Sequence, residues 1–101
     1  MDEFNLEFHR CPSAMTRTRK MLALFNASDK REVKIVSIEP ALQDHIAAVL
    51  NAEYPNMSLS LEQAISIPER VMSHWQASPL FDEDDLENAP NQITLRVQKC
   101  G

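Results

Sequence analysis

The sequence predicts a two-layer α+β fold, in which three helices pack on a mixed four-stranded sheet in the order β-α-β-α-β-α-β. Apolar residues alternate with period two in three segments, a fourth short segment is apolar on both faces, and apolar residues recur every three or four residues in the three segments between them. With 101 residues and 44% hydrophobic content, the chain suits one core. We therefore expect a single α+β domain over residues 1–101, with the first two strands parallel if they are neighbours.

The first strand and the first helix meet near Cys11. Phe4, Leu6 and Phe8 alternate with polar residues, which predicts a strand over residues 4–10 with one buried face. The helical pattern starts at Ser13, which we expect to act as the N-cap. Its apolar stripe comprises Met15, Thr18, Met21, Leu22 and Phe25, and the helix ends in a turn over residues 26–29.

A second strand and a second helix follow. Residues 33–38 form a short run with apolar residues on both faces, as expected of an interior strand. Pro40 suits the first turn of the next helix, and the pair Tyr54-Pro55 ends it. The apolar stripe of this helix comprises Leu42, Ile46, Val49 and Leu50.

Residues 57–67 alternate between apolar and small polar side chains and predict a long third strand. A competing interpretation starts a helix at Ser60, with Gln63 completing a capping box. Ser66 and Glu69 form another capping box, which predicts a third helix that turns Val71, Met72 and Trp75 inward and ends before Pro79. We expect residues 82–91 to form an acidic loop with one helical turn and residues 93–98 to form the last strand.

Composition and charge exclude several classes of protein. No apolar run approaches the ~18 residues of a membrane-spanning helix, and the first four residues lack the features of a signal peptide, so we expect a soluble, cytoplasmic protein. The net charge of −5 is uneven: residues 1–35 hold seven Lys/Arg against five Asp/Glu, and residues 36–101 hold three against ten. Cys11 and Cys100 match no metal-ligand spacing, so we expect two free thiols.

Missing residue types argue against cofactors and metals. Gly101 is the single glycine, so the sequence has no phosphate-binding loop that needs backbone to approach a nucleotide, and we expect no cofactor. His9, His45 and His74 show no metal-type pairing, and no serine lies in a nucleophile elbow. We expect each histidine to lie on the surface or to be partly packed. The acidic run 82–85 lacks the spaced ligands and the turn glycine of a calcium loop.

Cys11 is the candidate catalytic residue. It lies between a strand and a helix, where the positive end of the helix dipole favours a thiolate. The segment Cys11-Pro12-Ser13-Ala14 resembles the active-site turn of thioredoxin and glutaredoxin relatives, including those with one cysteine. Ser66-Ile67-Pro68 is similar to the proline turn of that family. This resemblance implies, as an alternative fold, a thioredoxin-like α/β domain with a redox thiol.

A second resemblance starts at the same atom. Cys11 followed six positions later by Arg17 and then by Thr18 is similar to the phosphate-binding loop of low-molecular-weight tyrosine phosphatases. The loop here lacks glycine, Pro12 removes one amide donor, and no Asp is placed as a general acid. The simplest interpretation is that Cys11 is a small, half-buried and inert residue at the end of a strand.

The binding candidates are the basic residues of the first helix, Arg17, Arg19 and Lys20. The net negative charge and the lack of interleaved aromatic residues argue against nucleic acid as a partner. Because no complete catalytic set is present, we expect a small binding or regulatory module that acts through protein–protein contacts. Homodimerisation through a strand edge or a helix face is a further hypothesis. The alternative function is a thiol-dependent redox or transfer protein that uses Cys11.

Overall fold

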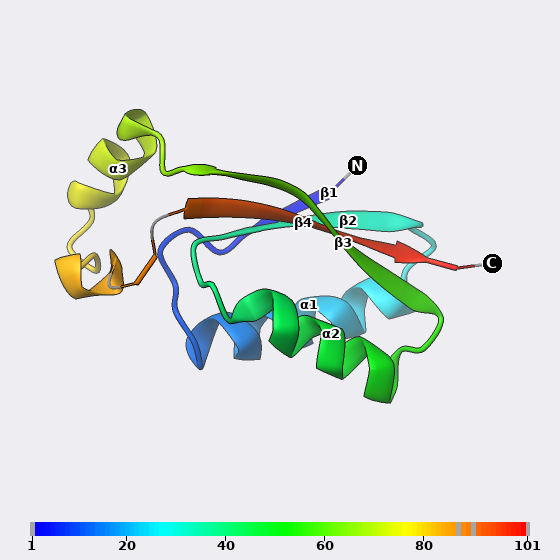
Figure 1. Cartoon of the computed structure of the whole chain (residues 1–101). Coiled ribbons are helices and arrows are strands. Elements are labelled where there is room, and N and C mark those ends of the chain that lie inside the picture. Colours follow the sequence, from blue (N-terminus) through cyan, green and yellow to red (C-terminus); the bar gives the residue numbers. More distant parts are fainter. Residues whose placement is uncertain (1, 87, 90, 101) are drawn as a thin grey trace.

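A computed structural model describes residues 2–86, 88–89 and 91–100 and confirms the α+β architecture (Figure 1). The sheet has four strands in the order β1-β2-β4-β3. Strands β1 and β2 are parallel, whereas β4 is antiparallel to both of its neighbours. Along the chain the elements are β1 (Asp2–Asn5), α1 (Ser13–Ala27), β2 (Glu32–Ser37), α2 (Leu42–Glu53), β3 (Met57–Ser66), α3 (Glu69–Gln76), the 3-10 turn η1 (Glu83–Leu86) and β4 (Asn91–Lys99).

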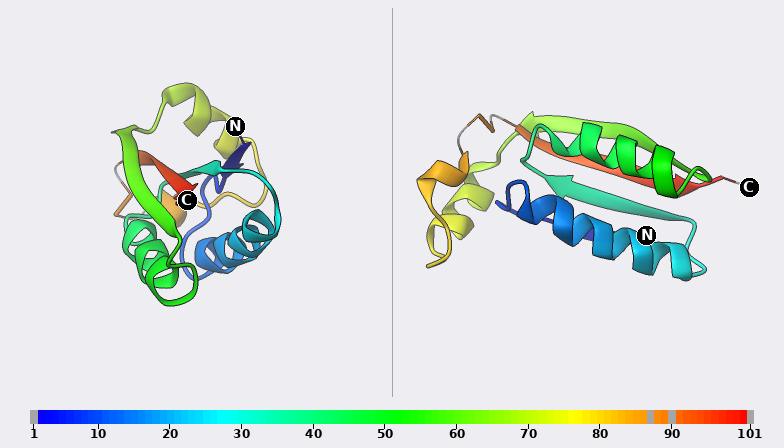
Figure 2. Two further views of the ribbon diagram at one scale, coloured as in Figure 1. Left: turned by 90° about the vertical axis from the view of Figure 1, so that its right-hand side faces the viewer. Right: turned by 90° about the horizontal axis from the view of Figure 1, so that it is seen from below.

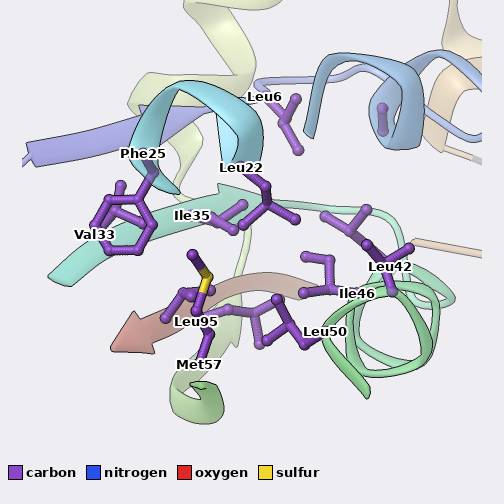
Figure 3. Close-up of a cluster of buried hydrophobic side chains, with 13 residues drawn as sticks. Leu6, Leu22, Phe25, Val33, Ile35, Leu42, Ile46, Leu50, Met57 and Leu95 are labelled. Carbon is purple, nitrogen blue, oxygen red and sulfur yellow. The ribbon is translucent and has the colours of Figure 1, made fainter. Parts of the chain in front are cut away.

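The main core lies between one face of the sheet and the helices α1 and α2, which run side by side beneath it (Figure 2). Ile35 of β2 and Leu95 of β4 are opposite each other in the register, and both are fully buried. They pack with Leu22 of α1 and Ile46 of α2 in the cluster drawn in Figure 3. These residues stand at the period-two and helical positions that the sequence pattern indicates.

A second, smaller cluster lies at the end of the sheet, where α3 and η1 pack (Figure 1). Its centre is Trp75, which is 2% exposed and meets the ring of Phe8 edge to face at a centroid distance of 5.8 Å. Phe81 packs edge to face on the same phenylalanine at 5.1 Å. Such ring contacts stabilise beyond the area they bury, so α3 and Phe81 are tied to the segment that follows β1.

The opposite face of the sheet is polar along its middle. Lys34 of β2 and Arg96 of β4 both form ion pairs with Glu62 of β3, and the Lys34 contact measures 3.2 Å. Arg96 also lies 3.7 Å from Glu32. The register of β3 against β4 shifts between Leu61 and Gln63, which is a β-bulge at Glu62.

Several expected boundaries and caps differ from the structure. The first strand ends at Asn5 rather than at residue 10, because Glu7 adopts a positive φ of 50° while its N–H bonds to the Asn5 side chain. Neither expected N-cap forms: Ser13 is already inside α1, and α3 begins after Pro68 without a side-chain cap. Residues 57–66 form a strand, so the helical interpretation from Ser60 is wrong.

The arrangement also decides the alternative fold. A helix, α3, follows Pro68 where a thioredoxin-like sheet requires a strand, so the thioredoxin-like prediction is wrong. The C-terminal strand β4 lies inside the sheet, and β1 and β3 form its edges. None of the helices in the described part of the chain is long and apolar enough to cross a membrane.

Candidate functional site

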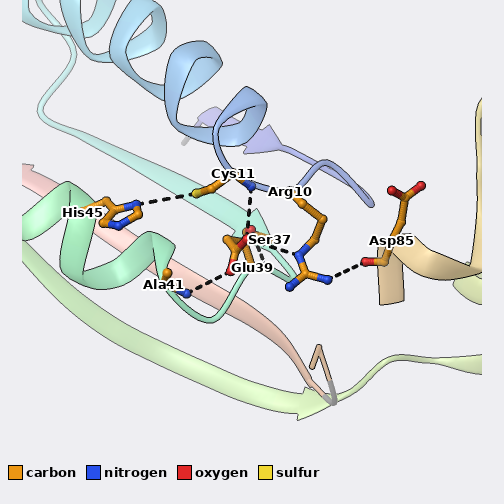
Figure 4. Close-up of polar contacts among 7 residues, drawn as sticks. All are labelled: Arg10, Cys11, Ser37, Glu39, Ala41, His45 and Asp85. Atoms are coloured by element: carbon orange, nitrogen blue, oxygen red, sulfur yellow. Dashed lines mark hydrogen bonds and ion pairs between the residues drawn. The ribbon is translucent and has the colours of Figure 1, made fainter. Parts of the chain in front are cut away.

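The topology brings three segments together at the edge of the sheet where the carboxyl ends of β1 and β2 lie. Because β1 and β2 are parallel neighbours, the residues that follow them emerge at the same edge. Arg10 and Cys11 follow β1 and precede α1, and Glu39 follows β2. Helix α2 then starts at Leu42 and places His45 in its first turn. Residues up to 34 positions apart in sequence therefore meet around Cys11 (Figure 4).

Glu39 holds this edge together. It is 7% exposed, and its carboxylate accepts hydrogen bonds from the backbone N–H of Cys11 at 3.1 Å and of Ala41 at 3.1 Å. Arg10 forms an ion pair with the same carboxylate, with 3.2 Å between Nε and Oε1. The Arg10 guanidinium also donates to the backbone carbonyl of Asp85 at 2.7 Å, which links the site to η1. Charge-assisted bonds of this kind are the strong ones in proteins, so they fix the backbone at Cys11.

The thiol of Cys11 contacts an imidazole. Its Sγ lies 3.5 Å from Nδ1 of His45, within the range of a sulfur hydrogen bond (Figure 4). Cys11 is partly buried, and His45 is exposed. Cys11 also lines a polar pocket of about 410 Å³ with Arg10, Glu39 and η1. In the tautomer that leaves Nδ1 unprotonated, an imidazole at this distance can accept the thiol proton.

The electrostatic environment keeps the Cys11 thiol protonated. Burial raises the pKa of Cys11, the negative charge of Glu39 raises it further, and the Met15 backbone and Arg10 oppose these effects without overcoming them. This direction is opposite to the thiolate that the helix dipole led us to expect. Burial also opposes ionisation of Glu39, yet the hydrogen bonds from Ala41, Cys11 and Arg10 hold the pKa of its carboxyl below the usual range.

The predicted basic residues lie in two places on α1. Arg17 and Lys20 line an open groove beside β1. Arg19 lies on the side of α1 that faces α2 and forms an exposed ion pair with Glu53 at 3.1 Å. The arginine linked to Cys11 is Arg10, because the Glu39 carboxylate binds Arg10 and also accepts a hydrogen bond from the Cys11 N–H.

The phosphatase resemblance finds no support in this arrangement. That resemblance needs Arg17 and free backbone amides around the thiol, whereas Arg17 lines the groove and the Cys11 N–H is engaged by Glu39. Cys11 and Pro12 are joined by a cis peptide bond. The segment Ser66-Ile67-Pro68 belongs to the other resemblance, that to thioredoxin relatives. It follows the edge strand β3, and β4 separates β3 from β2.

Sequence reasoning missed His45 and Glu39. Each histidine was expected to be a surface or partly packed residue, and Glu39 was not singled out. A signal was present, because both residues follow the second of two parallel strands and must emerge beside whatever follows the first. Among the described residues, no cluster of three or more His, Cys, Asp or Glu side chains is arranged to hold a metal.

Comparisons of the chain with protein-family models, curated proteins and solved structures gave no match. The fold and the site therefore define its class: a two-layer α+β domain with one cysteine at the edge where its two parallel strands end, next to a histidine and a buried carboxylate.

Proposed function

We propose that the chain is a thiol-dependent transfer protein, in which Cys11 accepts a group from one protein partner and passes it to another. The observation that supports this proposal is the 3.5 Å contact between Cys11 Sγ and His45 Nδ1 beyond the carboxyl ends of β1 and β2. Two side chains 34 positions apart meet there on a backbone anchored by Glu39. The proposal joins the two hypotheses from the sequence, a module that acts through protein contacts and a reactive Cys11.

In this proposal Cys11 carries a sulfur atom of the partner through a sulfur–sulfur bond, and it does not carry an acyl group as a thioester. An acyl transfer develops negative charge on an oxygen and needs nearby amide donors. At Cys11 the N–H of the residue itself is bonded to Glu39, Pro12 has no N–H, and the Met15 backbone acts on the thiol sulfur itself. Exchange at a sulfur–sulfur bond needs no such donors.

The exchange step balances with the residues present. His45 Nδ1 takes the proton of the Cys11 thiol, and Sγ attacks one sulfur of a disulfide or persulfide on the partner. A new sulfur–sulfur bond forms at Cys11 while the old bond of the partner breaks, and the leaving thiolate takes the proton from His45. A thiol with a raised pKa is a stronger nucleophile once deprotonated, and it is unreactive before that.

A single thiol at this site supports carriage rather than internal oxidation. Cys100 follows the end of β4 beside the start of β2, where Gln98 pairs with Glu32, whereas Cys11 lies beyond the end of β2. The length of β2 separates the two thiols by roughly 20 Å, and both are free. The sulfur bound to Cys11 therefore stays there until a second partner removes it.

Glutathione disulfide tests the proposal. The full-length protein is incubated with it across pH 6–9, and peptide mapping measures the mixed disulfide at Cys11 and at Cys100. We expect His45→Gln to slow the reaction of Cys11 by about tenfold or more near neutral pH, because the proton acceptor is lost. His74→Gln is the matched control, since His74 is an exposed helical histidine on α3. Equal rates for the two variants would contradict the proposal.

A second candidate function is a binding module that forms homodimers through β3. The outer edge of this ten-residue strand has no partner among the described residues, and Leu61 and Ile65 are 47% and 39% exposed. Light scattering of the protein at micromolar concentration gives the mass. A clean monomer mass would remove this candidate, and a dimer mass that Leu61→Lys abolishes while Leu80→Lys does not would support it.

A further inference from the structure

A basic, apolar groove runs between β1 and α1, on the side of the helix away from α2. Its cavity of about 770 Å³ adjoins a second cavity of about 220 Å³, and Phe4, Met21 and Leu24 line both. Leu24 is 74% exposed and continues the apolar lining of Phe4 and Met21 into solvent. A contiguous apolar surface with polar residues at its rim is typical of a surface that another molecule covers.

The polar residues of the groove are cationic at one end. Arg17 and Lys20 line the larger cavity together with Pro12, and neither forms an ion pair within the described part of the chain. Glu3 and Lys30 line the smaller cavity at the other end, so that end carries one charge of each sign. The groove therefore offers apolar contacts along its length and unneutralised positive charge toward Pro12, the residue next to Cys11.

We infer that this groove docks an acidic amphipathic helix of a partner protein. From Pro12 to Leu24 the groove follows α1 for roughly 18 Å, which matches about three turns of a bound helix. The apolar side chains of such a helix cover Met21 and Leu24, and its carboxylates pair with Arg17 and Lys20. Complementary charge of this kind speeds association and selects the orientation of the partner.

The inference goes beyond the proposed transfer at Cys11 and does not require it. A helix docked with its carboxylates toward Pro12 brings the partner close to Cys11, so the two proposals are compatible. They are tested by different measurements, because peptide binding does not depend on the state of the thiol.

The probe is a fluorescent, end-capped peptide of about 18 residues, long enough to form a helix. Leucines occupy one face and glutamates the other, and a control peptide has lysines in place of the glutamates. We expect the acidic peptide to bind the full-length protein with a Kd of roughly 1–100 μM in anisotropy measurements, and the basic peptide at least about tenfold more weakly. Added salt weakens the binding of the acidic peptide.

Two pairs of variants locate the site. Arg17→Glu reverses one groove charge and should weaken binding by about tenfold, whereas Arg70→Glu makes the same change on the exposed face of α3 and should leave it unchanged within about twofold. Leu24→Gln removes the exposed apolar contact and should weaken binding by about fivefold. Its control is Leu80→Gln, because Leu80 is 81% exposed and lies outside the groove.

Other occupants would appear as different results. Equal binding of the acidic and basic peptides, or equal effects of the groove and control variants, overturns the inference. Absence of binding of the acidic peptide also overturns it. Two other occupants would then show themselves directly: vesicles of anionic lipid would bind in an Arg17-dependent way, or the protein would associate with a second copy of itself through the acidic segment of η1. The four substitutions change exposed side chains and the two peptides change only the ligand, so loss of the fold does not explain a negative result.

Discussion

Replacement of Glu39 by glutamine tests the construction of the Cys11 edge most directly. The buried carboxylate accepts bonds from the N–H groups of Cys11 and Ala41 and forms the ion pair with Arg10. In Glu39→Gln one oxygen remains as an acceptor, and the new NH₂ group faces donors. With the amide oxygen at the Oε1 position, the contact with Ala41 is lost, and the contacts with Cys11 and Arg10 remain without the negative charge.

The magnitude follows from these contacts. A hydrogen bond to a charged group contributes about 1.5–3 kcal/mol. Arg10 keeps its bond to the Asp85 carbonyl and 22% of its side chain is exposed, so it is not left buried without a partner. We therefore expect Glu39→Gln to lower the free energy of unfolding by roughly 2–4 kcal/mol, a large share of the ~5–15 kcal/mol of a small domain.

Urea unfolding followed by tryptophan fluorescence and circular dichroism measures this loss. The matched control is Glu53→Gln, because Glu53 also binds an arginine but in an ion pair that is about half exposed. We expect the control to change stability by less than about 1 kcal/mol. If the two variants are equally stable, Glu39 does not anchor this edge and the reasoning is refuted.

Glu39→Gln also gives a second, independent prediction, which concerns the pKa of the Cys11 thiol. The negative charge of Glu39 contributes to the raised pKa of the Cys11 thiol, so its removal should lower that pKa. The rate of alkylation of Cys11 against pH, with Cys100 in the same sample as the control, measures the shift. An unchanged or higher Cys11 pKa in Glu39→Gln would show that Glu39 does not act on the thiol.

Three further predictions concern stability. Folding lowers the pKa of Glu39, so its ionisation stabilises the protein above the unfolded pKa of about 4.3, and this contribution is lost as the pH falls through the folded pKa. As the pH is lowered from 6 to 3, the urea midpoint should therefore fall more steeply for the wild type than for Glu39→Gln. Leu95→Ala, at a fully buried site, should cost about 2–5 kcal/mol in urea unfolding, against less than about 1 kcal/mol for the half-exposed Leu61→Ala, and similar costs would contradict the assignment of the core. Glu62→Gln should cost about 0.5–1.5 kcal/mol at low salt and less at 1 M salt, whereas a cost independent of salt would show that its ion pairs with Lys34 and Arg96 contribute little.

The elements could be predicted from the sequence where one face of a segment is buried. The short apolar run around Val33 and Ile35 and the helical spacing of Leu42, Ile46 and Val49 reflect burial against the core, and the structure confirms both segments. The helix caps failed because capping depends on the local backbone: Pro12 and Pro68 start α1 and α3 without a side-chain bond.

The site could be predicted only in part. The position of Cys11 between a strand and a helix follows from local pattern, and the structure confirms it. The contact with His45 and the burial of Glu39 depend on β1 and β2 being neighbours, because the sequence predicted parallel strands only on that condition and local pattern does not contain the strand order. The direction of the Cys11 pKa was missed for the same reason, because burial and the charge of Glu39 are tertiary effects that outweigh the helix dipole.

The ion pairs of Glu62 on the polar face of the sheet also decide how β3 aligns with β4. On the core side β3 offers Met57, Leu59 and Leu61, and a slip by two residues would exchange one apolar side chain for another at little cost. On the polar side its regular positions are Ser58 and Ser60 before Glu62, so the same slip would leave Lys34 and Arg96 facing hydroxyl groups. Burial of apolar side chains therefore determines which face of β3 turns inward. The alignments that burial leaves nearly equal in energy differ in their ion pairs, and the carboxylate of Glu62 favours one of them.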